Sequence, residues 1–184
     1  MGAWHGWYHV DGHTYGTWAP GDPRGWREKR HKKHVEGDYL NPPLPGTGDA
    51  LHAYSHEQLK HTPVHLTPDQ REVAGKALVE MLVHQDIELI VLSLDAIHYH
   101  LLGRFGNGQV RQRVGRAKKH AYFRLREQWP VQKVWQRLSN VTPITDRAHQ
   151  LNVFDYIQRH KGKGAWVWTY RQGLHWQDPN TQDL

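Results

Sequence analysis

Two short apolar stretches separated by one polar break constrain the fold of this chain more than any other feature. Residues 87–94 are rich in Ile, Leu and Val, and residues 97–105, which include Leu101, Leu102 and Phe105, give a second predicted strand after Asp95 and Ala96. Apolar runs of this length, bounded by turn-forming residues, are typical of buried strands. The pair therefore predicts an antiparallel hairpin. Neither run approaches the roughly 20 apolar residues that a membrane-spanning helix needs, so no transmembrane segment is expected.

A helix is predicted to begin directly after Thr67. Thr67 is a typical N-cap, Pro68 suits the first helical position, and Gln70 has the spacing of a capping box. Apolar side chains then share one face until near Gln85, where the helix is expected to end. A second, cationic helix is predicted over residues 107–128, because apolar positions recur there at helical spacing and basic residues occupy the other faces.

The remaining segments have weaker patterns. We expect strands over residues 1–18, 131–138 and 165–170, and a third helix that follows residues 143–146 and contains His160. Prolines and glycines make residues 19–66 an irregular, basic insertion that cannot form one long element. Together the elements predict a single α+β domain over residues 1–184, with helices packed on an antiparallel sheet.

Charge and composition favour a nucleic-acid partner. The formal net charge is +6, with six Lys/Arg over residues 24–34 and eight over residues 104–126, where there is no acidic residue. Concentrated Lys and Arg chiefly bind phosphates, although a solvated helix face is the alternative for either cluster taken alone. The absence of cysteine excludes disulfides, thiolate zinc sites and a cysteine nucleophile, and it is consistent with a reducing compartment.

Two pairs of residues carry the candidate chemistry. His98 and His100 flank Tyr99 on a predicted strand, so both imidazoles point to one face, where they can bind a divalent ion. Tyr156 and His160 stand four residues apart on the third predicted helix and share a face. A tyrosine attacks a phosphodiester when a cation or base stabilises its phenolate, and a His-bound metal meets that need. The alternatives are a core aromatic for Tyr156 and a chance pair among the 16 histidines.

These residues resemble those of the single-tyrosine HUH transposases, including the REP-associated tyrosine transposases. In that family two histidines around one mostly hydrophobic residue bind metal. A nucleophilic tyrosine on a later helix is followed, four positions on, by a polar residue that completes the site. His98-Tyr99-His100 matches the first feature, and Tyr156 with His160 matches the second. Two departures are the bulky Tyr99 between the histidines and His160 in place of a Gln or Asn.

The resemblance extends over roughly residues 4–170. It includes the segments TYGTW at residues 14–18, GRAKK at residues 115–119 and VWQR at residues 134–137. The insertion at about residues 19–66 is longer than in minimal members of the family, so its role is not carried over.

The resemblance implies a ferredoxin-like or RRM-like HUH endonuclease domain that acts as a DNA transposase. It would cleave and rejoin single-stranded DNA through a covalent 5′-phosphotyrosine link on Tyr156, with His98, His100 and His160 binding Mg²⁺ or Mn²⁺. The expected DNA contacts are basic residues of the two clusters: Arg104, Arg111, Arg113, Arg116, Lys118, Lys119, Arg27 and Arg30. The implied partner is single-stranded or hairpin DNA, with no membrane and with a homodimer as one assembly that the family allows. The implied location is the cytoplasm of a prokaryote, at the nucleoid when bound to DNA.

Two other functions stay open. One is a non-catalytic or domesticated DNA-binding protein of the same fold. The other is a His-rich metal-binding or hydrolytic protein unrelated to DNA, against which the acid-free residues 104–126 argue. Trp4, Trp7, Trp18 and Trp26 are candidates for stacking on unpaired bases, with ordinary core packing as the alternative for each.

Overall fold

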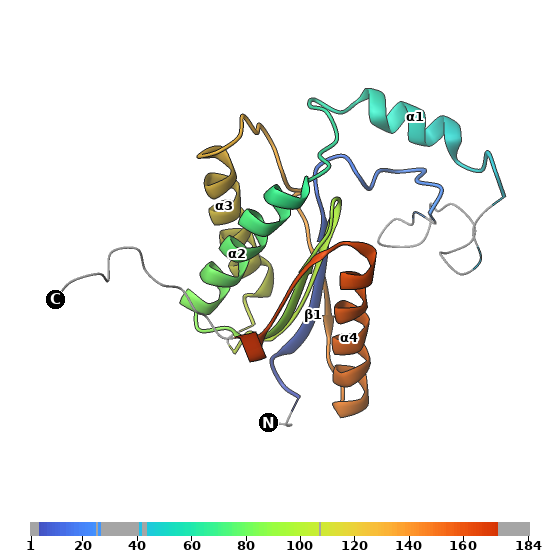
Figure 1. Ribbon diagram of the computed structural model, residues 1–184. Coiled ribbons are helices and arrows are strands. Elements are labelled where there is room, and N and C mark those ends of the chain that lie inside the picture. The colour runs from blue at the N-terminus through green and yellow to red at the C-terminus, as the bar shows by residue number, and fades with distance from the viewer. Residues whose placement is uncertain (1–3, 25, 27–40, 42–43, 107, 173–184) are drawn as a thin grey trace.

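A five-stranded antiparallel sheet forms the centre of the computed structural model (Figure 1). The structure describes residues 4–24, 26, 41, 44–106 and 108–172. In chain order its elements are β1 (Trp7–His13), α1 (Asp49–Glu57), α2 (Pro68–His84), β2 (Glu88–Leu94), β3 (His98–Arg104), α3 (Val110–Arg126), β4 (Asn140–Pro143), α4 (Arg147–Arg159), η1 (His160–Lys163), β5 (Trp166–Thr169) and η2 (Tyr170–Gln172).

The strands lie in the order β4-β1-β3-β2-β5, and every neighbouring pair is antiparallel. From β1 to β4, by way of α2 and α3, the chain has the βαββαβ order of ferredoxin-like domains. The fifth strand extends this sheet by pairing with β2. The predicted α+β class, with helices packed on an antiparallel sheet, is confirmed.

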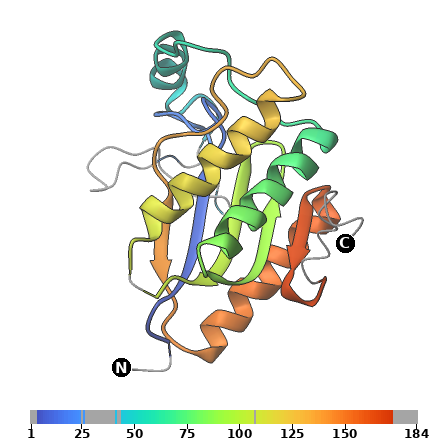
Figure 2. The same cartoon turned by 90° about the vertical axis from the view of Figure 1, so that its left-hand side faces the viewer.

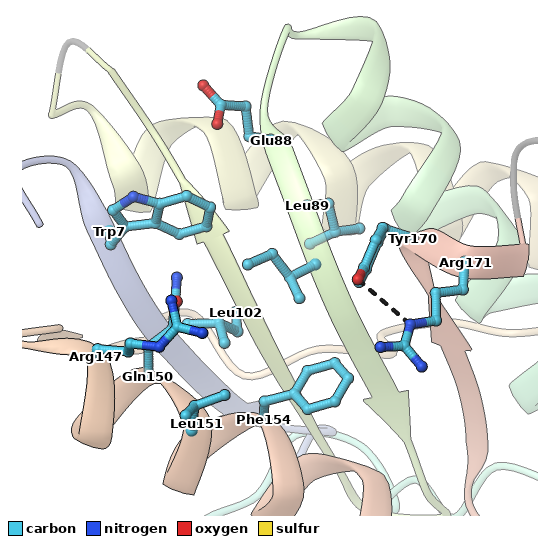
Figure 3. A pocket seen from close by; sticks show the side chains of 11 residues that line it. Trp7, Glu88, Leu89, Leu102, Arg147, Gln150, Leu151, Phe154, Tyr170 and Arg171 are labelled. Atoms are coloured by element: carbon cyan, nitrogen blue, oxygen red, sulfur yellow. Dashed lines mark hydrogen bonds between the residues drawn. The ribbon is translucent and has the colours of Figure 1, made fainter. Parts of the chain in front are cut away.

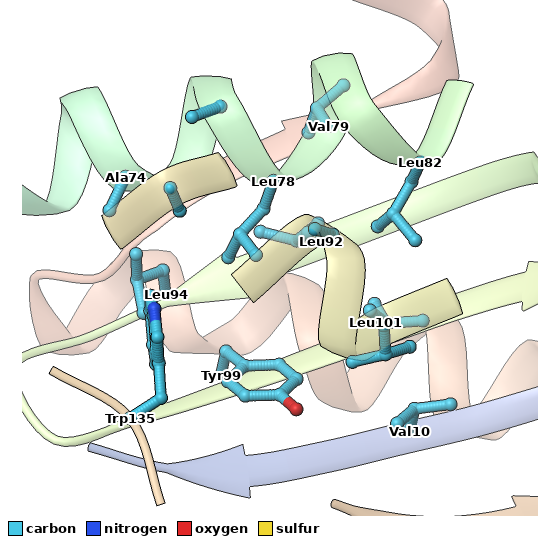
Figure 4. Close-up of a cluster of buried hydrophobic side chains, with 14 of the residues drawn as sticks. Val10, Ala74, Leu78, Val79, Leu82, Leu92, Leu94, Tyr99, Leu101 and Trp135 are labelled. Carbon is cyan, nitrogen blue, oxygen red and sulfur yellow. The ribbon is translucent and has the colours of Figure 1, made fainter. Parts of the chain in front are cut away.

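Helices cover both faces of the sheet. α2 and α3 lie side by side on one face, and α4 lies on the other (Figures 1 and 2). The larger core lies under α2 and α3 and includes Leu78, Leu92 and the fully buried ring of Tyr99 (Figure 4). A smaller core joins α4 to the sheet through Val153 and Ile157. The basic helix α3 is therefore on the opposite face of the sheet from α4.

The predicted helix after Thr67 is confirmed as α2. The backbone N–H of Gln70 donates to Oγ1 of Thr67 over 3.3 Å, and the backbone N–H of Thr67 donates to Oε1 of Gln70 over 3.0 Å. The helix ends at its C-cap Gln85, as predicted. Among the described residues, no helix combines the length and apolar character needed to cross a bilayer.

The predicted strand over residues 131–138 is wrong. In this segment only Trp135 makes an isolated bridge, and the strand of this region is Asn140–Pro143 instead. Nζ of Lys118 donates to the carbonyl oxygen of Gln136 over 2.6 Å. The backbone N–H of Tyr15 also donates to the carbonyl oxygen of Val134 over 2.8 Å, and the N–H of Gln136 donates to the carbonyl oxygen of His13 over 3.0 Å. The segment is therefore held by a side chain of α3 and by one backbone bridge, and it does not form a regular strand.

The insertion at residues 19–66 contains a helix, α1, that the sequence did not reveal. It begins after Gly48, whose φ of 83° lies in the left-handed region, and it has neither a side-chain cap nor a buried residue. A helix with no buried face shows no apolar periodicity, so treating the whole segment as irregular was wrong. α1 stands away from the sheet (Figure 1).

Candidate metal and tyrosine site

Side chains from β3 and α4 meet on the α4 face of the sheet. His98 and His100 point to this face, whereas Tyr99 between them is buried in the opposite core, with its Oη 2.6 Å from Oγ of Ser139. His160, the C-cap of α4, reaches the same place. One ring nitrogen from each of the three histidines lies within 4.8 Å of the other two. The three histidines predicted as metal ligands are therefore brought together.

Two of these imidazoles are held through Nδ1 by oxygen atoms. Nδ1 of His98 lies 2.7 Å from Oδ2 of Asp95, and Nδ1 of His160 lies 3.0 Å from the carbonyl oxygen of Tyr156. A ligating histidine normally donates its second ring N–H to such an oxygen, which fixes the ring. Because Nδ1 is engaged in both residues, Nε2 is the nitrogen that remains for a metal ion.

Asp95 also shapes the site through the turn in which the sequence placed it, whereas its contact with His98 was not predicted. Its Oδ1 accepts the backbone N–H groups of Ile97 and His98, each over 2.7 Å, and so forms the turn between β2 and β3. Burial alone would raise the pKa of Asp95, but the hydrogen bonds and charge of His98, with the N–H of Ile97, lower it to about 2. The carboxylate therefore stays ionised beside His98. In the sequence, the feature that pointed to Asp95 was its position in the break of the predicted hairpin, three residues before His98.

His100 is held by another imidazole rather than by an oxygen. Its Nδ1 lies 3.1 Å from Nε2 of His9, and the two rings stack with centroids 5.3 Å apart. Nε2 of His100 is buried and has no hydrogen-bond partner within the described residues. This nitrogen belongs to a ring 4.8 Å from that of His98 and 4.9 Å from that of His160, centroid to centroid. A buried, unsatisfied imidazole nitrogen in such a group fits a metal ligand.

Three histidines at the site, His100, His160 and His9, are suited to the neutral form that binds metals. Burial, followed by the neighbouring imidazoles of His98, His9 and His160, lowers the pKa of His100 to about 2. Burial also lowers the pKa of His160 and of His9. These rings therefore keep a lone pair on one nitrogen at neutral pH.

The first strand adds a second group of ligand atoms that the sequence left without a role. His9 and Asp11, together with His100, offer ligand atoms within 4.8 Å of one another. In the register of β1 and β3, Asp11 lies opposite His100, and His13 lies opposite His98. His9, Asp11 and His13 alternate along the chain, and this spacing indicated that they share one face of a strand. The sequence did not show which strand β1 pairs with, so it did not show that these residues lie beside His98 and His100.

Tyr156 lies beside the histidine cluster. Its ring centroid is 4.8 Å from that of His160 and 5.2 Å from that of His100, and both contacts are edge-on. The side chain is 40% exposed, whereas the next residue, Ile157, is fully buried. The ring of Tyr156 therefore borders the histidines and is partly open to solvent.

The predicted DNA-contact residues that the structure describes do not gather at this site. Five of them lie on α3, on the opposite face of the sheet (Figure 2): Arg111, Arg113, Arg116, Lys118 and Lys119. Arg104 lies at the far end of β3 from His98 and pairs with Oε1 of Glu88 over 3.2 Å. The predicted phosphate contacts on α3 and the predicted nucleophile Tyr156 therefore lie on opposite faces of the sheet.

Lys118, also predicted to contact DNA, is buried in the fold and is not exposed on the surface. It is 6% exposed, and its Nζ donates to the carbonyl oxygens of Gln136 and Arg137 over 2.6 Å and 3.4 Å. Burial lowers its pKa to about 8. Arg27 and Arg30, the two remaining predicted contacts, lie outside the described residues.

Comparison of the chain with protein-family models and with curated proteins gives no match.

Proposed function

We propose that this chain is a metal-dependent single-strand DNA nuclease of the HUH type, which cleaves and rejoins DNA through Tyr156, as a DNA transposase does. The observation that carries the proposal is the contact of the Tyr156 ring with the rings of His160 and His100, whose centroids are 4.8 Å and 5.2 Å away. A ring nitrogen of each of these two histidines and of His98 lies within 4.8 Å of the others, and Nδ1 of all three is engaged. Three Nε2 atoms are therefore available to a metal ion beside a phenol, an arrangement suited to phosphoryl transfer.

In the proposed reaction, Oη of Tyr156 attacks the scissile phosphorus. The phenol proton passes to solvent water, the bond from phosphorus to O3′ breaks, and the released O3′ takes up a proton from solvent. The 5′ phosphate stays on the tyrosine, and the reverse attack by a 3′-hydroxyl rejoins the strand. A divalent ion, Mg²⁺ or Mn²⁺, on Nε2 of His98, His100 and His160 would supply positive charge for the phosphate oxygens and the phenolate.

The other residues of the site position these groups. Asp95 and His9 hold His98 and His100 through Nδ1, and the carbonyl of Tyr156 holds His160. The nucleophile and one ligand are thus fixed to each other by one turn of α4. Since geometry of this kind is set before substrate arrives, little reorganisation is needed during the reaction.

A covalent adduct tests the proposal. The full chain is incubated with Mn²⁺ and labelled single-stranded DNA from the ends of its own locus, and denaturing electrophoresis detects a protein–DNA adduct. Tyr156→Phe is expected to abolish the adduct, whereas Tyr54→Phe, which changes another exposed tyrosine on α1, is expected to leave it unchanged. An undiminished adduct in Tyr156→Phe overturns the proposal.

A DNA-binding protein without cleavage is the second candidate function. It is favoured by the position of the basic helix α3 across the sheet from Tyr156, because α3 can bind phosphates without any part in the site. Salt-dependent binding of DNA with no adduct under Mg²⁺ or Mn²⁺ supports this candidate and excludes the first.

A further inference from the structure

A cavity of about 490 Å³ opens on the α4 face of the sheet, apart from the histidine cluster (Figure 3). Aliphatic side chains of β2 and β3 form its floor, and three aromatic rings stand around that floor: Trp7, Phe154 and Tyr170. These rings come from β1, α4 and η2. Its volume is within the range of about 300–1,000 Å³ that is usual for sites that bind small molecules.

Cationic side chains lie on two sides of this aromatic cavity. Arg147 stands on the side of Trp7, and Arg171 stands on the side of Tyr170 (Figure 3). Nε of Arg171 donates to Oη of Tyr170 over 3.3 Å. The acidic lining residue, Glu88, pairs with Arg104 over 3.2 Å. The cavity therefore combines an apolar, ring-lined interior with two guanidinium groups at its edges.

We propose that this cavity binds one unpaired nucleotide of single-stranded DNA, and this inference rests on the proposed function. Aromatic rings stack on a base of any sequence, because every base has a π face. Guanidinium groups bind phosphate oxygens in a fork and also stack on rings. The base lies among Trp7, Phe154 and Tyr170, and the phosphates on either side of it contact Arg147 and Arg171.

The cavity lies near enough to Tyr156 for one strand to occupy both places. Leu102 of the floor follows His100 on the same face of β3. Phe154 and Tyr156 are two residues apart on α4, so they leave the helix in directions about 160° from each other. A DNA strand that occupies both the cavity and the site at Tyr156 crosses α4, whose diameter with side chains is about 10–12 Å. Because a few nucleotides span this distance, the cavity binds an unpaired base a few nucleotides from the scissile phosphate.

Binding of an oligothymidylate tests the stacking. All proteins carry Tyr156→Phe, so that adduct formation does not contribute. Tyr170 is 53% exposed, and Tyr170→Ala is expected to weaken binding about ten-fold. Its matched control is Tyr54→Ala, which removes an exposed ring from α1 and is expected to change nothing. With an abasic strand of equal length, Tyr170→Ala is expected to have no effect.

The phosphate contact is tested with Arg147→Gln against Arg137→Gln, an exposed arginine outside the cavity. The first variant is expected to weaken binding of both the oligothymidylate and the abasic strand, and the second to weaken neither. If Tyr170→Ala and Arg147→Gln bind the oligothymidylate as tightly as their controls, the inference is overturned.

Photocrosslinking tests the cavity without changing it. A strand that contains 5-iododeoxyuridine is irradiated with the full chain, and the crosslinked peptides are identified by mass spectrometry. Crosslinks to Trp7, Phe154 or Tyr170 support the inference, and crosslinks confined to other peptides overturn it. Covalent adducts without these crosslinks support the proposed function and contradict the inference that the cavity binds a nucleotide. Crosslinks to the cavity without covalent adducts support nucleotide binding in the cavity and contradict the proposed cleavage.

Discussion

Nε2 of His9 lies 3.1 Å from Nδ1 of His100, so the innermost imidazole of the site is oriented by another imidazole. One of these two nitrogens must carry the proton. A metal ion on Nε2 of His100 places that proton on Nδ1. The Nδ1–H of His100 then donates a hydrogen bond to Nε2 of His9. His9 is therefore a positioning residue for the metal site.

Replacing His9 is expected to weaken metal binding. His9→Ala removes the acceptor for Nδ1 of His100, and loss of such a partner typically lowers metal affinity about 10–100-fold. Calorimetric titration with Mn²⁺ measures the change. The control is His84→Ala, which removes an exposed histidine at the end of α2. Equal affinity in His9→Ala and the unchanged protein would contradict the orienting role.

The third ligand is expected to set the choice of metal. His160→Gln replaces an imidazole nitrogen with an amide oxygen at the C-cap of α4. Mg²⁺ strongly prefers oxygen ligands, whereas Mn²⁺ tolerates an imidazole nitrogen better than Mg²⁺ does. We therefore expect a higher ratio of Mg²⁺ affinity to Mn²⁺ affinity in His160→Gln than in the unchanged protein, measured by titration. An unchanged ratio would show that His160 is not a ligand.

Two helical glycines are expected to respond oppositely to the same substitution. A Cβ on Gly75 of α2 would meet the ring of Trp166, whereas a Cβ on Gly115 of α3 meets nothing within 4 Å. Gly75→Ala is therefore expected to lower the free energy of unfolding by about 1–3 kcal/mol. Gly115→Ala is expected to raise it by up to about 1 kcal/mol. Urea unfolding measures both, and equal changes would contradict the packing of β5 under α2.

Lys118 is expected to make stability depend on pH in alkaline solution. Its pKa is lowered to about 8 in the folded chain, because the ammonium group is buried, and it is about 10.4 in the unfolded chain. Between these values the unfolded chain binds more protons, so the free energy of unfolding rises with pH, by on the order of 2 kcal/mol from pH 8 to 10. Lys118→Met lacks this rise. The free energy of unfolding is measured with urea at each pH. The same rise between pH 8 and 10 in both proteins would contradict the prediction.

Local patterns in the sequence predicted much of this molecule. The capping box of Thr67 and Gln70 specifies the start of α2 by bonds within four residues. The spacing of His98 and His100 fixes a common face on any strand. Such features need no knowledge of the rest of the chain.

Features that depend on distant partners were not predicted. His9 belongs to the site only because β1 pairs with β3, and Lys118 is buried because a loop covers it. The periodicity of α3 shows which of its residues face the core, but it does not show which face of the sheet the helix covers. The sequence therefore did not show that the basic helix α3 lies across the sheet from Tyr156.

The small buried face of α4 has a consequence for motion. Only Val153 and Ile157 of this helix are buried, whereas α2 buries six residues. Segments with little buried apolar surface open at a fraction of the global unfolding free energy, so amide hydrogens of α4 are expected to exchange faster than those of α2. An ion shared by His160 and β3 would raise the opening free energy of α4 by about 2.7 kcal/mol at a hundred times its Kd. Metal occupancy would then determine how often the tyrosine leaves its place over the sheet, and exchange kinetics would report it with no DNA present.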